Sequence, residues 1–231
     1  MCYTGVMLNP QGRRMPKSVY RKLINEMKAN PHGFYLYSTK PPTRVRTIIY
    51  GEAVSTLKAL RTAENLHFHF RLATSGLIDD VNVHGWKVGD YYITHNGIVL
   101  CYMSSVELSD TLKMIKDEVF TENLVKEEWV GLYNHIVRCG FTGTLFIVKH
   151  DFSNIVAINT GTYGVYYYNI NGIVFATSRP LGRKFHGKLY RNGVFKISYD
   201  GVTTLHKEPY VEDYSNDIWR LLGVSFLNLK Q

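Results

Sequence analysis

The second residue of the chain is a cysteine, and its position gives it chemistry that an internal cysteine lacks. Removal of the initiator Met is expected when residue two is small, and it would leave Cys2 with a free α-amine. The thiol is a nucleophile. An α-amine, with an unperturbed pKa of about 7.7–8.0, can take the thiol proton directly or through a water. The position also fits an ordinary cysteine near a chain end. A thiol reacts only when it is activated, so its position alone does not make Cys2 catalytic.

A second candidate is Arg71, which ends an apolar stretch and leads into the small residues 73–76. Its planar guanidinium suits a carboxylate, and a loop of small residues can approach a ligand closely and move. By itself the pattern equally fits a strand that ends in a surface arginine and a turn.

Asn96 and Gly97 form a pair that is typical of a two-residue hairpin turn. They predict one strand over residues 91–94 and another over residues 98–103. The same pair can bind an oxyanion, because a side-chain amide and a backbone N–H lie side by side. The two interpretations are compatible, since a tight turn can itself form the oxyanion hole.

Asp110 stands between Ser109 and Thr111, where a helix is expected to begin. Ser and Asp at such a position are usually N-caps. A carboxylate there could instead receive the ammonium group of a ligand.

Together these segments resemble the class II glutamine amidotransferases, which are N-terminal-nucleophile hydrolases that take ammonia from glutamine. The resemblance covers roughly residues 2 to 180 and rests on the order of several segments. They are Cys2, Asn30-Pro31-His32-Gly33-Phe34, His69-Phe70-Arg71-Leu72-Ala73-Thr74-Ser75-Gly76, Asn82-Val83-His84, His95-Asn96-Gly97-Ile98, Ser109-Asp110-Thr111 and Phe175-Ala176-Thr177-Ser178.

The resemblance implies a reaction centre built on Cys2. Cys2 would attack the side-chain amide of glutamine, with its own α-amine as the base. The Asn96 side chain and the Gly97 N–H would bind the oxyanion. The first step would give a γ-glutamyl thioester and ammonia, and water would then release glutamate.

The resemblance also implies a substrate site. Arg71 would hold the α-carboxylate of glutamine, and Asp110 would hold its α-ammonium. Thr74 and His84 would help shape the pocket. One fixed cation and one fixed anion match a free amino acid, which presents both opposite charges on one carbon.

Some residues depart from the family pattern. Ser75 replaces a His of the sugar-forming relatives, and Leu72 stands where some members have Trp. Asn30 and His32 replace charged residues of one version of the family. These changes leave the hydrolysis plausible and favour a member outside the sugar-transferring subgroup.

No metal site or cofactor is expected. His67 and His69 alternate as metal ligands can, but no Cys or third ligand stands at matching spacing. Cys101 and Cys139 lie among apolar residues, as buried small hydrophobes do.

Length and composition describe one domain. The 231 residues are 45% hydrophobic, which suffices for a core and excludes global disorder. No apolar run approaches the roughly 18 residues of a membrane span, and the start shows no secretory signal. The odd cysteine count, three, argues against a disulfide framework and for a reducing compartment. A cytoplasmic protein without membrane contact is expected.

The basic charge is partly local. The 27 Lys and Arg outnumber the 19 Asp and Glu by 8, and residues 179–196 contain no acidic residue. A solvated face is the usual explanation, and interleaved aromatic residues make contact with nucleic acid an alternative. The basic residues of this stretch are Arg179, Arg183, Lys184, Lys188, Arg191 and Lys196.

Periodicity and turn residues predict an α+β fold with antiparallel sheets. Helices are expected over residues 15–30, 55–63, 109–119, 123–138 and 213–222. Strands are expected over residues 34–37, 43–50, 66–71, 91–94, 98–103, 143–149, 155–159, 164–168, 173–177, 194–199 and 202–205.

The resemblance adds the order of the layers, a four-layer α/β/β/α sandwich. It implies a single glutaminase-type domain over residues 2–231, in which about 179–231 complete the second sheet and add a C-terminal helix.

The resemblance leaves no room for an acceptor-binding synthase domain. We therefore expect glutamine as substrate and a separate synthase or acceptor protein as partner for the ammonia. Two alternatives stay open. One is a stand-alone amidohydrolase that acts on a larger γ-glutamyl compound. The other is a non-catalytic scaffold that binds glutamine or associates with nucleic acid.

Overall fold

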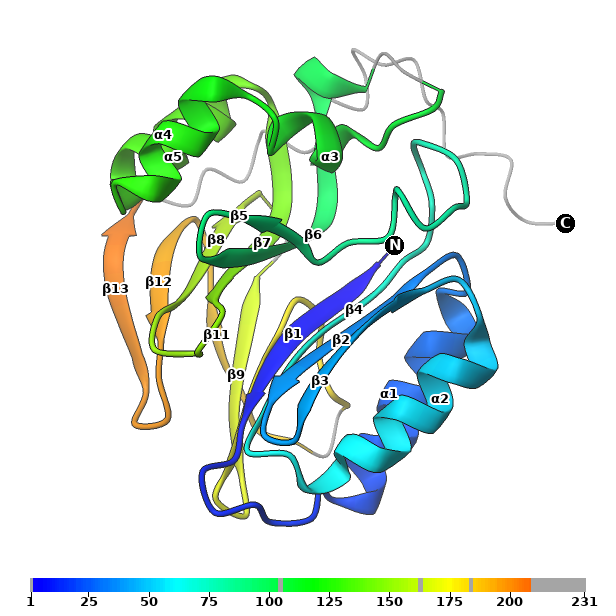
Figure 1. The fold of residues 1–231 in the computed structure, drawn as a ribbon. Coiled ribbons are helices and arrows are strands. Elements are labelled where there is room, and N and C mark those ends of the chain that lie inside the picture. Colours follow the sequence, from blue (N-terminus) through cyan, green and yellow to red (C-terminus); the bar gives the residue numbers. More distant parts are fainter. Residues whose placement is uncertain (1, 104–105, 162–163, 183–184, 209–231) are drawn as a thin grey trace, which may run out of the picture.

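Figure 1 shows the computed structural model, which describes residues 2–103, 106–161, 164–182 and 185–208. Within these residues two antiparallel sheets are stacked face to face, one of seven strands and one of six. The larger sheet has the order β11 (Lys188–Tyr190), β9 (Val165–Ile170), β10 (Ile173–Thr177), β1 (Tyr3–Leu8), β4 (Asn65–Phe70), β2 (Phe34–Thr39) and β3 (Pro42–Thr47). The smaller sheet has the order β13 (Val202–Lys207), β12 (Gly193–Ile197), β8 (Ile155–Thr160), β7 (Phe141–Lys149), β6 (Tyr91–Val99) and β5 (Trp86–Val88).

Helices cover the outer face of each sheet (Figure 1). The larger sheet is covered by α1 (Lys17–Ala29) and α2 (Tyr50–Ala59), which η1 (Leu60–Thr62) follows. The smaller sheet is covered by α3 (Asp110–Met114), α4 (Glu118–Val125) and α5 (Trp129–Arg138), and η2 (Leu100–Tyr102) follows β6. The layers run helix, sheet, sheet, helix, which confirms the expected four-layer sandwich.

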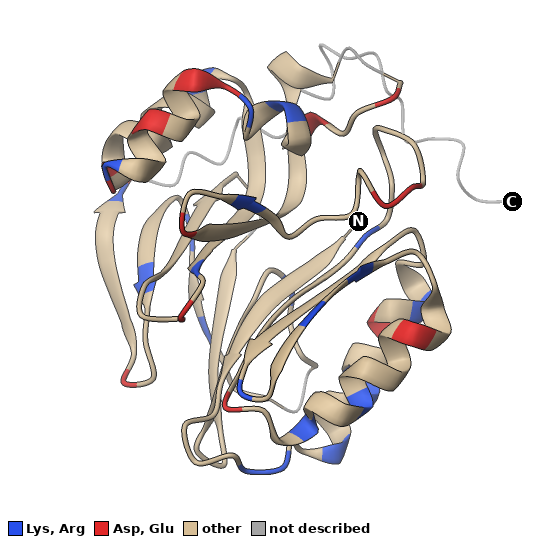
Figure 2. Cartoon of the chain, in the orientation of Figure 1, with Lys and Arg blue, Asp and Glu red and all other residues tan. Residues whose placement is uncertain are grey.

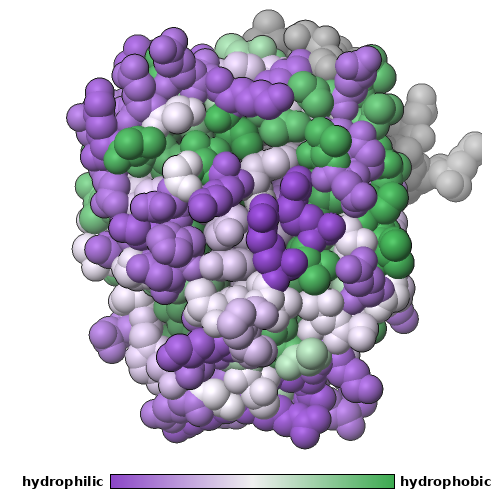
Figure 3. All heavy atoms as spheres, in the orientation of Figure 1, coloured by the Kyte–Doolittle hydropathy of each residue, from purple (hydrophilic) through white to green (hydrophobic). Residues whose placement is uncertain are grey.

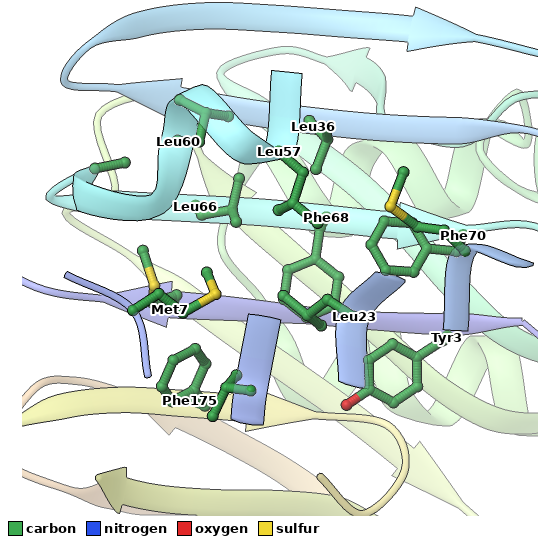
Figure 4. Packing of buried hydrophobic residues seen from close by; sticks show 14 of the residues in the cluster. Tyr3, Met7, Leu23, Leu36, Leu57, Leu60, Leu66, Phe68, Phe70 and Phe175 are labelled. Atoms are coloured by element: carbon green, nitrogen blue, oxygen red, sulfur yellow. The ribbon is translucent and has the colours of Figure 1, made fainter. Parts of the chain in front are cut away.

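β4 shows why the sheets stack in this way. Successive side chains of a strand point to opposite faces. Leu66, Phe68 and Phe70 therefore pack under α1 and α2, in the core drawn in Figure 4. His67 and His69 point the other way, toward the second sheet, and both are fully buried.

The predicted hairpin turn at Asn96-Gly97 is wrong. β6 is one unbroken strand, and its whole length pairs with β7. Gly97 lies opposite Gly143, and a Cβ at Gly97 would stand 1.9 Å from the Thr142 carbonyl oxygen. A glycine is required here because two strands approach closely. The Asn-Gly pair in the sequence does not distinguish this situation from a turn.

Both helices expected between residues 109 and 138 are interrupted. The first ends at Met114, because Asp117 caps a new helix and its carboxylate accepts the Phe120 N–H at 3.0 Å. The second is divided near Glu127, whose positive φ of 55° breaks the helix. The prediction missed β1, β5 and β11, and began α2 five residues late. The helix expected over residues 213–222 lies outside the described residues.

The basic stretch of residues 179–196 does not stay on one sheet. Lys188 is on β11 of the larger sheet and Lys196 is on β12 of the smaller one. Arg179 forms an ion pair with Glu26 of α1. Arg183 and Lys184 lie outside the described residues. Figure 2 shows Lys and Arg spread over both halves of the molecule. Among the described helices, none combines the length and the apolar character that crossing a membrane requires.

Candidate active site

Cys2 lies just before β1, beside the end of β4. The register of the two strands sets Tyr3 opposite Phe70, so the first residue before β1 meets the loop that follows β4. The Cys2 Sγ accepts the Leu72 N–H at 3.3 Å. Burial is the largest influence on the thiol and raises its pKa, while the bond from Leu72 acts in the opposite direction. The thiol is therefore protonated at neutral pH and needs a base to become a nucleophile.

Arg71 follows the last residue of β4 and is only 2% exposed. Its guanidinium donates to the carbonyl oxygen of Leu77 at 2.8 Å and to that of Ser75 at 2.6 Å. Burial lowers the pKa of Arg71, although a guanidinium stays charged in proteins. The side chain thus folds residues 72–77 back over the end of β4.

Asp110 begins α3, and Ser109 before it is the N-cap, with its hydroxyl accepting the Leu112 N–H at 3.2 Å. The capping interpretation is thus confirmed for Ser109. The Asp110 carboxylate makes other contacts. Its Oδ2 accepts the Val99 N–H at 2.8 Å and its Oδ1 accepts the Ser75 hydroxyl at 3.0 Å. The carboxylate therefore joins α3, β6 and the loop after β4.

A cavity of about 20 Å³ lies where these elements meet. Such a volume holds about one water, so the loop of residues 72–77 closes the site against a ligand as large as an amino acid. The cavity brings together all of the expected site residues except Asn96. It is lined by Cys2, Arg71, Leu72, Thr74, Ser75, His84, His95, Gly97, Ser109, Asp110 and Thr111.

Asn96 lies on the other face of β6, toward the larger sheet. Its Nδ2 donates to the Ser178 hydroxyl at 3.1 Å, and that hydroxyl also accepts the Thr4 N–H at 3.2 Å. The Asn96 Oδ1 is buried and has no partner among the described residues. The amide is thus fixed two residues along β1 from Cys2, next to the cavity and outside its lining.

Buried histidines surround the strand that carries Asn96 and Gly97. The rings of His69 and His84 stack with 3.8 Å between centroids and 3° between planes. The His95 Nδ1 contacts the Thr111 hydroxyl at 2.9 Å. Burial lowers the pKa of each of these histidines, and it lowers that of His67 to about 3. Across the described residues, no three His, Cys, Asp or Glu side chains are placed to hold a metal ion.

Sequence reasoning gave no role to several residues of the site. Each contacts one of the expected residues: Ser75 contacts Asp110, Ser178 contacts Asn96, and His95 contacts His84. All three stand inside the quoted family segments, so the segments themselves were the only signal that could have found them.

The segments beside the cavity expose large apolar side chains. Leu77, Ile78 and Val81 follow the loop after β4, and Met103 and Val106 precede α3, with exposures from 39% to 82%. The Leu77 N–H donates to the Glu107 carbonyl oxygen at 3.2 Å, which joins the two segments. Figure 3 shows hydrophobic side chains toward the right-hand edge of this face, where these segments lie in Figure 1.

No protein-family model matches the sequence, and neither does any curated protein. Solved structures do resemble the chain in fold. The glutamine phosphoribosylpyrophosphate amidotransferase of B. subtilis, solved with ADP and GMP, aligns with a TM-score of 0.62 and 11% identity. An allosteric regulatory enzyme of purine biosynthesis aligns with a TM-score of 0.61 and 13% identity. Each alignment covers 91% of this chain and 50% of the other, so the chain spans about half the length of these two enzymes.

A third structure matches over its whole length. It is a glutamine aminotransferase class-II domain protein from Silicibacter pomeroyi, with a TM-score of 0.52, 14% identity and coverage of 91% of this chain and 100% of that one. The fold that the sequence segments imply is the fold that the structure has. The chain has the N-terminal-nucleophile hydrolase fold of the class II glutamine amidotransferases.

Proposed function

We propose that the protein hydrolyses the side-chain amide of glutamine through a thioester on Cys2 and passes the ammonia to a separate protein. The observation that carries this proposal is the shared cavity of Cys2, Gly97, Arg71 and Asp110. A nucleophile, a backbone donor, a cation and an anion around one space are what cleavage of an amino acid amide requires.

In the proposed first step, the α-amine of Cys2, freed by removal of Met1, takes the thiol proton. The sulfur forms a bond to the amide carbon, and the carbonyl oxygen becomes an oxyanion. The C–N bond then breaks, and the α-ammonium returns the proton to the departing nitrogen, which leaves as ammonia. Water attacks the thioester with the same amine as base, and glutamate leaves with the thiol restored.

The oxyanion would be bound by Gly97 and Asn96. The amide of Asn96 can serve if it is turned so that its oxygen accepts the Ser178 hydroxyl. That orientation gives the buried Oδ1 a partner, which it lacks otherwise, and it frees the two N–H donors. Ser178 is thus a proposed positioning residue for this donor.

Glutamine would bind between Arg71 and Asp110, with Thr74 and His84 as walls of the pocket. The charged groups are occupied by residues 75–77 in the closed site, so the loop must open before substrate enters. The substrate then replaces these contacts with its own carboxylate and ammonium.

The apolar segments beside the cavity support the separate partner. Contiguous exposed apolar side chains around a site are typical of surfaces that bind another protein. The Leu77 carbonyl oxygen accepts from Arg71 of the cavity, and Ile78 and Val106 stand three residues along the chain from Ser75 and Ser109, which line it. A protein bound to these side chains would therefore lie close to the source of the ammonia.

The test is ammonia release from glutamine by wild type and by Cys2→Ala, with the N-terminal mass measured for both. We expect turnover by wild type only, and a protein that begins at Cys2. Absence of ammonia at saturating glutamine, or an enzyme that keeps Met1, would contradict the proposal. Turnover of γ-glutamyl peptides with little turnover of glutamine would favour the amidohydrolase alternative. Glutamine binding by an inactive wild type would favour the scaffold.

A further inference from the structure

The strand that pairs with the outer edge of β6 ends just before the proposed oxyanion donors, Asn96 and Gly97. β5 pairs with β6 only as far as Ile93. The Gly85 N–H then donates to the Ile93 carbonyl oxygen at 3.0 Å. Among the strands that the structure describes, none lies on this side of β6 from His95 onward, although His95, Asn96 and Val99 are buried. Buried backbone N–H and C=O groups need partners, because an unpaired one destabilises the folded chain.

Two histidine side chains take the place of the missing strand. The His95 N–H donates to the Nδ1 of His84 at 3.1 Å, and the Nε2 of His69 donates to the His95 carbonyl oxygen at 3.0 Å. The two rings come from different parts of the fold, His69 from β4 of the opposite sheet and His84 from the segment before β5. They are stacked, so each restricts the movement of the other.

The next backbone groups on this edge belong to Gly97 and Val99. In an antiparallel strand the N–H groups of alternate residues point to the same side. The Val99 N–H donates to Asp110 Oδ2 at 2.8 Å, so the edge is fixed on both sides of Gly97. By this alternation the Gly97 N–H points to the same side of β6 as those of His95 and Val99, and Gly97 lines the cavity of Cys2.

We propose that His69 and His84 are positioning residues that hold the backbone of His95 and thereby aim the Gly97 N–H at the oxyanion. The inference rests on the proposed glutamine hydrolysis. It gives His84, a wall of the pocket, a further role in the rate of the chemical step.

The two histidines use different nitrogens, which allows a crossed experiment. His84 accepts at Nδ1, whose position the Asn side chain reproduces and the Gln side chain overshoots. His69 donates from Nε2, whose position Gln reproduces and Asn does not reach. All four variants are polar and uncharged, so they differ in geometry more than in their effect on the core.

We expect His84→Asn and His69→Gln to keep kcat for glutamine within about fivefold of wild type. His84→Gln and His69→Asn should lower kcat by about 10- to 100-fold, somewhat less than the loss of an oxyanion donor, with KM changed less than about threefold. Equal kcat for Asn and Gln at both positions would overturn the inference. So would a rise in KM at unchanged kcat, because it would assign His84 to substrate binding.

His67 provides the matched control. It stands two residues before His69 on the same side of β4 and is equally buried, but its Nε2 contacts the Thr94 hydroxyl at 2.8 Å and not the backbone of β6. His67→Asn and His67→Gln should both leave kcat unchanged, whatever they do to the unfolding free energy. A fall of kcat in both would show that any polar change in this layer suffices, and it would overturn the inference.

Amide hydrogen exchange separates this inference from the proposed function. Exchange in a peptide covering residues 91–99 should accelerate at least tenfold in His84→Gln and His69→Asn and stay at the wild-type rate in His67→Gln. If wild type releases no ammonia while exchange follows this pattern, the proposed function fails and the positioning by the two histidines stands. Unchanged exchange in all variants would overturn the positioning.

Discussion

The Ser75 hydroxyl donates to Asp110 Oδ1 across 3.0 Å, at the carboxylate proposed to receive the ammonium of the substrate. Ser75 Oγ also accepts the Asp110 N–H at 3.3 Å. One side chain of the closing loop therefore competes with glutamine for the same anion.

We expect Ser75→Ala to lower KM for glutamine, because the substrate no longer displaces this bond. A hydrogen bond of about 0.5–1.5 kcal/mol corresponds to roughly a two- to tenfold change. Steady-state ammonia release measures it, and Ser75→Thr, which keeps the hydroxyl, should resemble wild type. A higher KM in Ser75→Ala would mean that the hydroxyl assists binding.

Arg71→Lys should raise KM by about tenfold or more, since an ammonium cannot reproduce the two-pronged contact of a guanidinium with a carboxylate. The substrate provides the control. Wild type should strongly prefer glutamine to its α-amide, which lacks the carboxylate, and Arg71→Lys should lose most of that preference. Equal loss of activity on both compounds would mean that Arg71 does not bind the carboxylate of the substrate.

Gly97→Ala should destabilise the fold by about 3 kcal/mol or more, as overpacking against rigid backbone does. The new Cβ would meet the Thr142 carbonyl oxygen at 1.9 Å. Gly143→Ala should behave alike, because its Cβ would meet the Asn96 carbonyl oxygen at 2.2 Å. Gly51→Ala in α2 is the control, since nothing lies within 4 Å and Ala favours a helix. Urea unfolding measures all three, and a stable Gly97→Ala protein would refute the close approach.

Stability should fall with acid because His67, His69 and His84 are buried in the neutral form. Their folded pKa values are lowered, so the unfolded chain, with a pKa near 6.5, binds protons first. The stabilisation is present above about pH 6.5 and is lost as pH falls toward the folded pKa, at up to about 1.4 kcal/mol per pH unit for each histidine. The charged and titratable neighbours include Arg46, Arg71 and His95, all of which oppose a further positive charge, and Asp110 lies beyond His95.

Urea unfolding between about pH 6.5 and 5.5 tests this slope above most of the carboxylate titration. His67→Gln should reduce the slope by about one proton, because it removes one buried titrating ring. An unchanged slope in this variant, or constant stability across the range, would mean that the rings are accessible to protons in the folded chain.

The sequence predicted the strands of the inner layers well where alternation was strong. β4 is an example, since its phenylalanines and histidines face opposite sides. Asn96 and Gly97 were misread because a glycine forced by a facing strand and a glycine at a turn leave the same local pattern. Only the position of Gly143, far along the chain, distinguishes the two.

Most residues of the candidate site could be predicted from the sequence, but the closure of the site by its own loop could not. Cys2, Arg71 and Asp110 could be named from family-like segments, and the fold places them around one cavity. That the loop fills the contacts of Arg71 and Asp110 with its own atoms depends on the path of residues 72–77 in space. Likewise, two histidines can bind the backbone of His95 only because β5 ends before it. No local sequence pattern shows where β5 ends.

The layer between the two sheets differs from one end to the other. Away from Cys2 it is apolar, and residues such as Val6, Phe146 and Ala176 pack there without directional bonds. Near Cys2 it is crossed by the contact of the Thr4 and Thr94 hydroxyls at 2.6 Å and by the bonds of the histidines. Apolar packing tolerates exchange of side chains of similar volume, whereas hydrogen bonds fix one sheet against the other. The chain therefore has one end where substitutions can accumulate and another where the two sheets cannot slide without separating the nucleophile from its strand of donors.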